Sequence, residues 1–335
     1  MAKGLRDGVK VAVTGGTGFI GGYLVEELRS RGHDVVCLAR PSSRLQALEA
    51  LGVQTVAGDL DDANALALLV AGCQVVFHLA ALSDEGRYPE QAFWQANVEG
   101  TRNLSLASIK AGVELFVFCS TVDVLGPTPA NGLDERAPYQ PETKYARTKA
   151  EAEKLVKALC APTKTRYCIL RPSIVCGPRD SSNRKNIFKA LSRGGFVVFG
   201  NGKNKFDLVD VRDLVRGMAS VPGNRAACNQ TFILSGQEKP ALRSYLQAIA
   251  VALGKKARLL FLPVFVAYLL AYPMSFIARL LPGFPRMGVN TVRYFTTPHV
   301  YSSSKAERLL GYKPVIPFQQ ALNDTVRWDM ERDLL

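Results

Sequence analysis

The stretch "KVAVTGGTGFIGGYLVEEL" (residues 10–28) decides the fold. Its first five residues form a short apolar run typical of a buried strand, and a helical spacing of apolar residues follows the glycines. Glycine allows a tight turn and lets backbone N–H groups and a helix N-terminus approach a pyrophosphate. Because the glycines stand between a predicted strand and a predicted helix, the stretch predicts a nucleotide-binding turn at the start of a parallel sheet.

The same strand–helix–strand pattern repeats through the first half of the chain. The predicted strands are 10–14, 34–40, 54–59, 73–81, 115–120 and 166–172, and the predicted helices are 22–32, 63–72, 91–111 and 144–159. Alternation of this kind, with nearly continuous apolar strands, is typical of a parallel sheet covered by helices on both faces. The prediction is an α/β fold with a Rossmann-like doubly wound parallel sheet.

The alternation ends after residue 178. A polar stretch at 179–186 reads as a loop, 194–205 as a glycine-punctuated hairpin, and 206–211 and 231–235 as late strands of the sheet. The chain from about residue 236 is mostly helical. We therefore predict two domains, with boundaries as follows: a nucleotide-binding domain of residues 1–178 and 205–235, and a smaller, mostly helical C-terminal substrate-binding region of residues 179–204 and 236–335. The smaller region is expected over the carboxyl edge of the sheet, where such folds bind ligands.

The amino-acid composition limits the kinds of partner, metal site and cellular location that we expect. The formal charge of +13 favours anionic partners such as nucleotide phosphates or acidic lipid headgroups, and no nucleic-acid-binding motif is present. Seven cysteines without a CxxC pair favour reduced thiols in the cytoplasm. Three histidines outside any ligand spacing argue against a metal site. The basic start has too short an apolar run for an export signal, so the predicted location is cytoplasmic.

The end of the second predicted strand bears on the choice of nucleotide. An acidic residue there would bind the ribose 2′-OH of NAD, but the chain has Arg40, followed by Ser42, Ser43 and Arg44. A guanidinium can bind a 2′-phosphate through charge-assisted hydrogen bonds, whereas a carboxylate would repel it. The pattern predicts a preference for NADP(H), with NAD(H) as the alternative if these arginines are only solvated.

Further residues at strand ends are expected around the cofactor. Asp59 and Leu60 follow the third strand and are placed at the adenine, while Ala80 and Ala81 end the fourth strand near the pyrophosphate and ribose. His78 is assigned no chemistry. The predicted cofactor-binding set is Gly15, Thr17, Gly18, Phe19, Ile20, Gly21, Arg40, Ser43, Asp59, Leu60, Leu79, Ala80, Ala81, Tyr145, Lys149 and Pro172.

Tyr145 and Lys149 lie four residues apart at the start of a predicted helix, so they share one helical face. Hydride transfer to or from a carbinol needs an acid–base group beside the reacting oxygen. A free tyrosine titrates near 10, and a neighbouring ammonium would lower that pKa by stabilising the tyrosinate. We therefore expect Tyr145 to be the proton donor, Lys149 to activate it, and Thr121 or Ser120 to hold the substrate oxygen. A tyrosine packed on a lysine stem would give the same spacing without any chemistry.

Eight motifs follow one another in the order found in one family: "TGGTGFIG" (14–21), "GDL" (58–60), "HLAA" (78–81), "NVEGTRN" (97–103), "STVDVLG" (120–126), "YARTK" (145–149), "LRPSIVCGP" (170–178) and "YSSSKAERLLGYKP" (301–314). The chain resembles the extended short-chain dehydrogenases/reductases, which include sugar-nucleotide epimerases, dihydroflavonol reductases and 3β-hydroxysteroid dehydrogenases. The resemblance implies that Thr121, five residues before Gly126, is the catalytic hydroxyl. It also implies a homodimer formed through two helices of the large domain.

Three enzymatic branches of this family compete, and a non-catalytic class is kept beside them. A dehydratase is disfavoured, because Val122 replaces the acid that would protonate the departing hydroxyl, although Asp123 keeps the second acid. A sugar-nucleotide epimerase with tightly bound NAD is the main alternative, and Arg40 departs from its acidic pattern. A non-catalytic NADP sensor would usually lack the tyrosine or the lysine. The favoured prediction is an NAD(P)-dependent oxidoreductase that interconverts a secondary alcohol and a ketone on a bulky apolar substrate, 3β-hydroxysteroid-like, sterol-like or long-chain.

An uncharged segment near the C-terminus supports an apolar partner. Residues 259–278 carry no charge over a length that could cross a bilayer, but Pro263 and Pro273 interrupt them and Arg258 and Arg279 flank them. Ordinary buried helices of the small domain would also give this pattern. The alternatives are a cover for a lipid-like substrate or a peripheral membrane contact through residues 259–281, with a true span least favoured.

Overall fold

The computed structural model describes residues 8–86, 88–180, 184–280, 289–332 and 334. Its large lobe is built on a seven-stranded sheet in the order β10-β6-β5-β4-β1-β2-β3, with every neighbouring pair parallel. The strands are β1 (Lys10–Thr14), β2 (Asp34–Ala39), β3 (Gln54–Ala57), β4 (Val75–His78), β5 (Leu115–Cys119), β6 (Arg166–Pro172) and β10 (Gln230–Leu234). The predicted Rossmann-like doubly wound sheet is confirmed.

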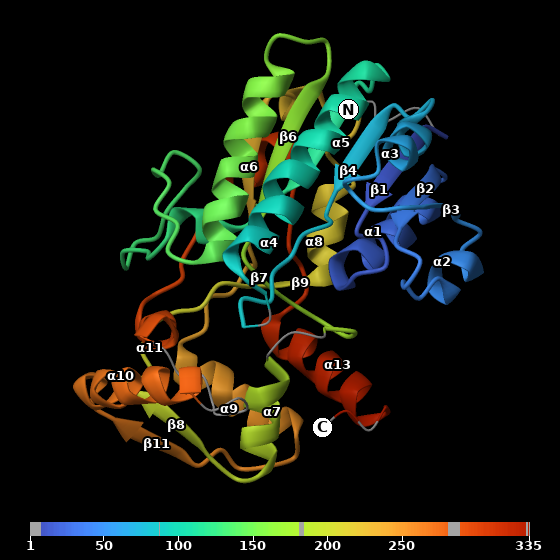
Figure 1. Cartoon of the computed structure of the whole chain (residues 1–335). Helices are drawn as coiled ribbons and strands as arrows, with labels where there is room; N and C mark the ends of the chain where they lie inside the picture. Colours follow the sequence, from blue (N-terminus) through green and yellow to red (C-terminus); the bar gives the residue numbers. More distant parts are fainter. Residues whose placement is uncertain (1–7, 87, 181–183, 281–288, 333, 335) are drawn as a thin grey trace.

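Helices cover both faces of this sheet (Figure 1). Alternate residues of β1 show why, since Val11 and Val13 face one core layer and Ala12 faces the other. The first layer is covered by α1 (Phe19–Ser30), α8 (Val211–Met218) and α12 (Ser304–Leu310), and the second by α3 (Ala63–Val70), α5 (Gly100–Lys110) and α6 (Lys144–Cys160). Short elements complete this lobe, namely α2 (Gln46–Ala50), α4 (Glu90–Trp94), the 3-10 turns η2 (Val122–Leu125) and η3 (Arg225–Ala227), and a π-helical turn η1 (Gln95–Glu99) inside the helix predicted at 91–111.

Two strand predictions after residue 178 are wrong. The stretch predicted as a hairpin forms β8 (Phe196–Phe199), which pairs in parallel with β11 (Leu259–Leu262). The polar residues after β8 cannot supply a second apolar strand, so β8 pairs with the start of the uncharged segment instead. The stretch 206–211 contributes β9 (Leu208–Asp210), which pairs with β7 (Ile174–Cys176) in a separate small sheet rather than joining the large one.

The small lobe lies below the large sheet in Figure 1, where α7, α9, α10 and the β8–β11 pair gather. Its helices are α7 (Arg184–Ser192), α9 (Leu242–Ala252), α10 (Val264–Leu280), α11 (Val289–Thr296) and α13 (Phe318–Met330). Part of the stretch predicted as a loop at 179–186 is therefore the start of α7, and residues 181–183 lie outside the described part of the chain. Among the described helices, none combines the length and apolar character that crossing a bilayer requires.

Candidate active site

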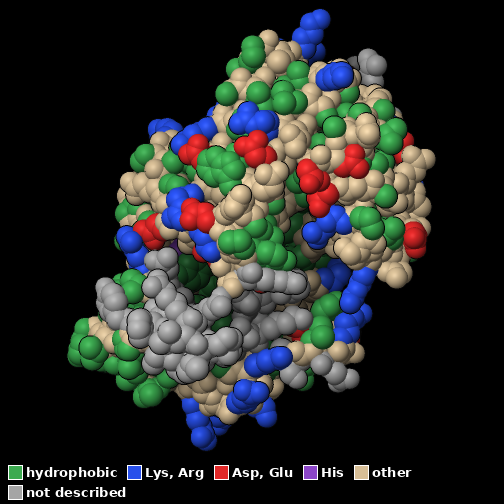
Figure 2. Space-filling view, in the orientation of Figure 1, with side chains coloured by type: hydrophobic (Ala, Val, Ile, Leu, Met, Phe, Trp, Pro, Cys, Tyr) green, Lys and Arg blue, Asp and Glu red, His purple; other side chains and the backbone are tan. Residues whose placement is uncertain are grey.

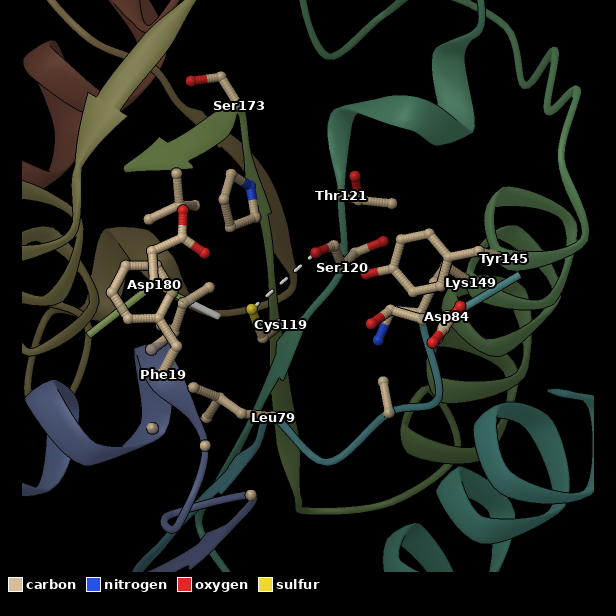
Figure 3. Close-up of a pocket in the computed structure, with 18 residues that line it drawn as sticks. Phe19, Leu79, Asp84, Cys119, Ser120, Thr121, Tyr145, Lys149, Ser173 and Asp180 are labelled. Carbon is tan, nitrogen blue, oxygen red and sulfur yellow. Dashed lines mark hydrogen bonds between the residues drawn. The ribbon is translucent and has the colours of Figure 1, made fainter. Parts of the chain in front are cut away.

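A cavity of about 640 Å³ opens at the carboxyl ends of β1, β4, β5 and β6. Figure 3 shows the glycine turn and Phe19 on one side of it and Thr121, Tyr145 and Lys149 on the other. The lining residues are Gly15, Gly18, Phe19, Ile20, Gly21, Leu79, Ala81, Ser83, Asp84, Cys119, Ser120, Thr121, Tyr145, Lys149, Pro172, Ser173, Val175 and Asp180. The structure thus brings the predicted catalytic set and most of the predicted cofactor-binding residues to one cavity.

The glycine turn is closed so tightly that side chains cannot fit in it. Gly15 has φ +77°, and a Cβ there would lie 2.7 Å from the backbone nitrogen of Ala80. A Cβ on Gly21 would lie 2.0 Å from the carbonyl oxygen of Gly15. Gly18 caps α1 without a side-chain hydrogen bond, so the first backbone N–H groups of the helix remain open to an anion. This arrangement fits the pyrophosphate of a dinucleotide.

The catalytic helix α6 starts where two side chains fix its first turn. The hydroxyl of Thr143 accepts a hydrogen bond from the backbone nitrogen of Ala146 at 3.1 Å, and the Glu85 carboxylate accepts one from the backbone nitrogen of Tyr145 at 3.0 Å. These bonds satisfy orphan donors at the helix N-terminus, the usual function of capping residues. The start of α6 and the loop after β4 are thereby held together beside the cavity.

Thr121 comes from the end of β5. Its hydroxyl oxygen accepts a hydrogen bond from the backbone nitrogen of Asp123 at 3.2 Å and so caps the short turn η2. This bond fixes the oxygen at the cavity wall, and the hydroxyl hydrogen can donate to a substrate oxygen. Neighbouring Ser120 is 4% exposed, and within the described structure its Oγ has no hydrogen-bond partner. A buried polar atom without a partner in a cavity is expected to meet a bound ligand.

Lys149 is buried beneath Tyr145. Its side chain is 1% exposed, and its Nζ lies 4.0 Å from the centre of the Phe118 ring. Burial lowers the pKa of Lys149 to about 8, and it raises the pKa of Tyr145 well above its ordinary value, with Cys119 and Asp123 raising it further. The net pKa of Tyr145 is thus raised in the nucleotide-free protein, and the prediction of a lowered pKa is wrong in this structure. Desolvation disfavours the charged form of both groups, so Tyr145 stays protonated at neutral pH.

The depressed pKa predicts that Lys149→Met stabilises the nucleotide-free protein at pH 7. Between about pH 8 and 10.5 the unfolded chain binds more protons at Lys149 than the folded chain does, so the free energy of unfolding rises with pH in this range. Below pH 8 Lys149 is charged in both states, and its burial then destabilises the folded protein most. Removing the buried charge should raise the free energy of unfolding by about 1–3 kcal/mol at pH 7, with a smaller gain near pH 10. Urea unfolding at the two pH values measures this. Lys154→Met, an exposed lysine of the same helix, is the control expected to change little. A Lys149→Met protein less stable than wild type at pH 7 would refute the desolvation argument.

A buried ion pair holds α6 on the sheet one turn beyond Lys149. Glu153 of α6 accepts hydrogen bonds from Arg171 of β6 at 2.7 and 2.9 Å, and Tyr139 donates to the same carboxylate at 2.8 Å. Both partners of the pair are almost completely buried. Removing one partner of such a pair would leave the other charge buried without a counterion, so the position of the catalytic helix depends on both residues.

Asn97 was missed as a site residue, although it opens the motif "NVEGTRN". It lies in the π-helical turn, and its side chain exchanges two hydrogen bonds with the backbone of Leu82 and donates a third to Thr148 of α6. The loop that continues to Ser83 and Asp84 in the cavity wall is thereby tied to the catalytic helix. π-helical turns are frequent at functional sites.

Six predicted cofactor-binding residues do not line the cavity, namely Thr17, Arg40, Ser43, Asp59, Leu60 and Ala80. The side chain of Leu60 is buried in the core against Gly100 of α5, where the missing side chain of glycine leaves room for it. Arg40 is exposed at the end of β2. Ala80 lies under Gly15, where its backbone nitrogen donates to Thr14 at 3.3 Å.

The structure adds lining residues that were not predicted, namely Ser83, Asp84, Cys119, Ser173, Val175 and Asp180. Each of them lies within a few residues of a predicted strand end or motif, and this proximity could have been used to predict them. His78, by contrast, is fully buried and hydrogen-bonded to Thr14 and Thr101, and burial lowers its pKa to about 3. It ties β4 to its neighbours as a neutral side chain.

Comparison with known proteins places the chain in a family. A sequence profile of the NAD-dependent epimerase/dehydratase family matches residues 11–232, a span that contains the glycine turn, Thr121, Tyr145 and Lys149. The chain belongs to the NAD-dependent epimerase/dehydratase family. The predicted resemblance to extended short-chain dehydrogenases/reductases is confirmed, as is the prediction of a nicotinamide-dependent enzyme acting on CH–OH groups.

Individual relatives cover almost the whole chain. The chain is 31% identical to a 3-beta-hydroxysteroid dehydrogenase of Mycolicibacterium neoaurum, over 93% of this chain and 89% of that protein. It is 32% identical to a 2-alkyl-3-oxoalkanoate reductase of Stenotrophomonas maltophilia, over 94% of this chain and 97% of that protein. Among solved structures, the crystal structure of gox2253 superposes with a TM-score of 0.83 at 30% identity, covering 98% of this chain and 99% of the other.

Proposed function

We propose that the protein is an NADP(H)-preferring oxidoreductase that interconverts a secondary alcohol and a ketone on a bulky apolar substrate, 3β-hydroxysteroid-like, sterol-like or long-chain. The observation that carries the proposal is the position of Thr121, Tyr145 and Lys149 on one side of the cavity that starts at the glycine turn (Figure 3). Acid–base groups in that position are what hydride transfer at a carbinol carbon requires.

A nicotinamide bound in this cavity would supply or accept the hydride. In the reducing direction Tyr145 donates its phenolic proton to the substrate oxygen, and Thr121 donates a hydrogen bond to the same oxygen. Tyr145 holds its phenolic proton at neutral pH, as the acid in this step must. Lys149, one helical turn away, places a cation near the tyrosinate that remains after proton transfer and stabilises it.

The substrate class rests on two observations. The names of two relatives at 31% and 32% identity refer to a hydroxysteroid and an alkyl-substituted oxoalkanoate, both ring or chain compounds with large apolar parts. In addition, Val122 stands where a dehydratase would need an acid for the departing hydroxyl. These observations favour simple oxidation and reduction of an apolar substrate over elimination from a nucleotide sugar.

The cofactor preference is tested at Arg40. Its guanidinium is exposed at the end of β2 and can bind a 2′-phosphate, so we expect Arg40→Asp to weaken NADPH binding about tenfold or more, with a gain in NADH binding. Fluorescence titration with both nucleotides measures the ratio. Arg166→Asp, a charge reversal at the exposed first residue of β6, away from the carboxyl edge of the sheet, is the control for a general electrostatic effect. Equal changes in the two variants, or unchanged NADPH binding in Arg40→Asp, would contradict a specific role of Arg40.

The function itself is tested by following NADPH oxidation with ketones that carry apolar bodies, 3-oxosteroids first. The proposal expects turnover that depends on added nucleotide. Epimerisation of a UDP-sugar without added nucleotide would instead support a sugar-nucleotide epimerase. Nucleotide binding without any turnover across the ketone and sugar panels would support a non-catalytic sensor.

The homodimer is a further proposal. Trp94 of α4 and Leu106 of α5 are exposed on the large lobe, and they provide apolar surface that a second copy could cover. Sedimentation velocity would detect the dimer, and Leu106→Ser should weaken it if these helices form the interface.

A further inference from the structure

The positive charge of the protein is concentrated in two segments that build most of the small lobe, without α13, and that end at the start of α12 in the large lobe. Residues 181–206 and 239–306 contain fifteen Lys and Arg residues and no Asp or Glu, which leaves 27 basic against 29 acidic residues in the remaining chain. The whole excess charge of +13 therefore belongs to these two segments. The electrostatic field of so many uncompensated basic residues attracts anionic partners and orients them as they approach.

The same lobe exposes large apolar side chains at its outer end. Phe265 and Leu269 lie one turn apart on α10 and are 70% and 69% exposed, so they form one continuous apolar surface. The adjoining strand pair adds more, since Leu260 of β11 is exposed beside its registered partner Val197 of β8. We call the exposed apolar residues of α10, β8 and β11 the apolar end; they are Val197, Leu260, Phe261, Phe265, Leu269 and Leu270.

Basic side chains adjoin the apolar end. Lys255, Lys256 and Arg258 are exposed immediately before β11, and none of them forms an ion pair with a described residue. Figure 2 shows green apolar side chains at the lower left, where Figure 1 places α10 and β11, with blue Lys and Arg side chains below them. Apolar side chains next to unpaired cations are typical of surfaces that enter the headgroup region of a bilayer.

We propose that the apolar end docks on the surface of an anionic lipid bilayer without crossing it. The apolar residues would enter the headgroup and acyl boundary, while Lys255, Lys256 and Arg258 would contact acidic headgroups. A second copy is a poorer fit, because pairing two such ends would bring like charges together with no acidic residue in either segment to offset them. A nucleic acid would bind the cations through its phosphates but would leave Phe265 and Leu269 exposed to water.

The test is flotation of the full-length protein with phosphatidylcholine vesicles, with and without about 30% phosphatidylglycerol. We expect binding to the anionic vesicles that weakens at high salt. The double variant Phe265→Ser, Leu269→Ser should bind about tenfold or more weakly, since two apolar side chains no longer enter the boundary. Lys255→Glu, Lys256→Glu should lose binding by a similar factor on anionic vesicles only.

Matched controls come from the large lobe. Leu68→Ser replaces a side chain of α3 that is 67% exposed, and Lys164→Glu reverses an exposed charge; both should bind vesicles as wild type does. Nucleotide binding, which is measured separately, should be unchanged in all variants because every substituted residue is exposed and outside the cavity. Failure of wild type to bind either vesicle, or equal binding by all variants, would overturn the proposal. A change of oligomeric state in the Phe265, Leu269 variant without a change in lipid binding would also overturn it and assign the surface to self-association.

Discussion

Replacing Tyr145 by Phe should lower kcat about 10³-fold, within the range that general acid–base catalysis contributes. The change removes one oxygen atom from a half-buried ring, so the fold and the nucleotide cavity should persist. Because Tyr145 would act on the substrate oxygen, the affinity for NADPH should remain close to that of wild type. Single-turnover kinetics with a saturating ketone, together with a nucleotide titration, separate the chemical step from binding.

Tyr167→Phe is the matched control for this experiment. Tyr167 is a partly buried tyrosine near the start of β6, at the end of the strand opposite Pro172 and the cavity. Its substitution should leave kcat unchanged. A Tyr145→Phe enzyme that keeps most of its activity would remove Tyr145 from the mechanism, and an equal loss in both variants would point to a general structural effect.

Replacing Gly21 by Ala should abolish tight nucleotide binding and also destabilise the fold. The added Cβ would lie 2.0 Å from the carbonyl oxygen of Gly15, so the backbone of the turn must move. We expect a loss of about 1–3 kcal/mol in the free energy of unfolding, the usual range for overpacking, and a drop in NADPH affinity of about 10²-fold or more. Isothermal titration with NADPH and urea unfolding measure the two effects.

The next residue provides a control of the same chemistry. A Cβ at Gly22, also in α1, has no neighbour closer than 3.7 Å. Gly22→Ala should bind NADPH normally and gain up to about 1 kcal/mol of stability, because alanine favours the helix. Similar behaviour of the two alanine variants would contradict the claim that the glycine turn is closed against the dinucleotide site.

The sequence could predict the sheet and the catalytic set because their signals are local. Lys10–Thr14 is an apolar run next to glycines, and Tyr145 and Lys149 share one helical face whatever the rest of the chain does. Thr121 was preferred over Ser120 through the family pattern, and the structure places both in the cavity wall. Such features depend on neighbours within a few residues, and the sequence displays those directly.

Apart from the start of α7, which was predicted as a loop, the errors involve interactions between residues far apart in the chain. The pairing of β8 with β11 joins segments separated by β9, α8, β10 and α9, and no local sequence pattern predicts this pairing. The stretch 206–211 was expected in the large sheet, but its strand β9 pairs with β7 in a separate small sheet. The pKa of Tyr145 depends on how much water the fold removes, which spacing to Lys149 does not reveal.

The central claim is an exchangeable nicotinamide nucleotide at a Tyr145–Lys149–Thr121 site, as opposed to an internal redox cycle. The most direct test is to denature the purified protein, identify any nucleotide released, and titrate the native protein with NADPH and NADH. We expect less than one equivalent of released nucleotide and tighter binding of NADPH than of NADH. One equivalent of tightly held NAD per chain would contradict it and identify an epimerase-like cycle.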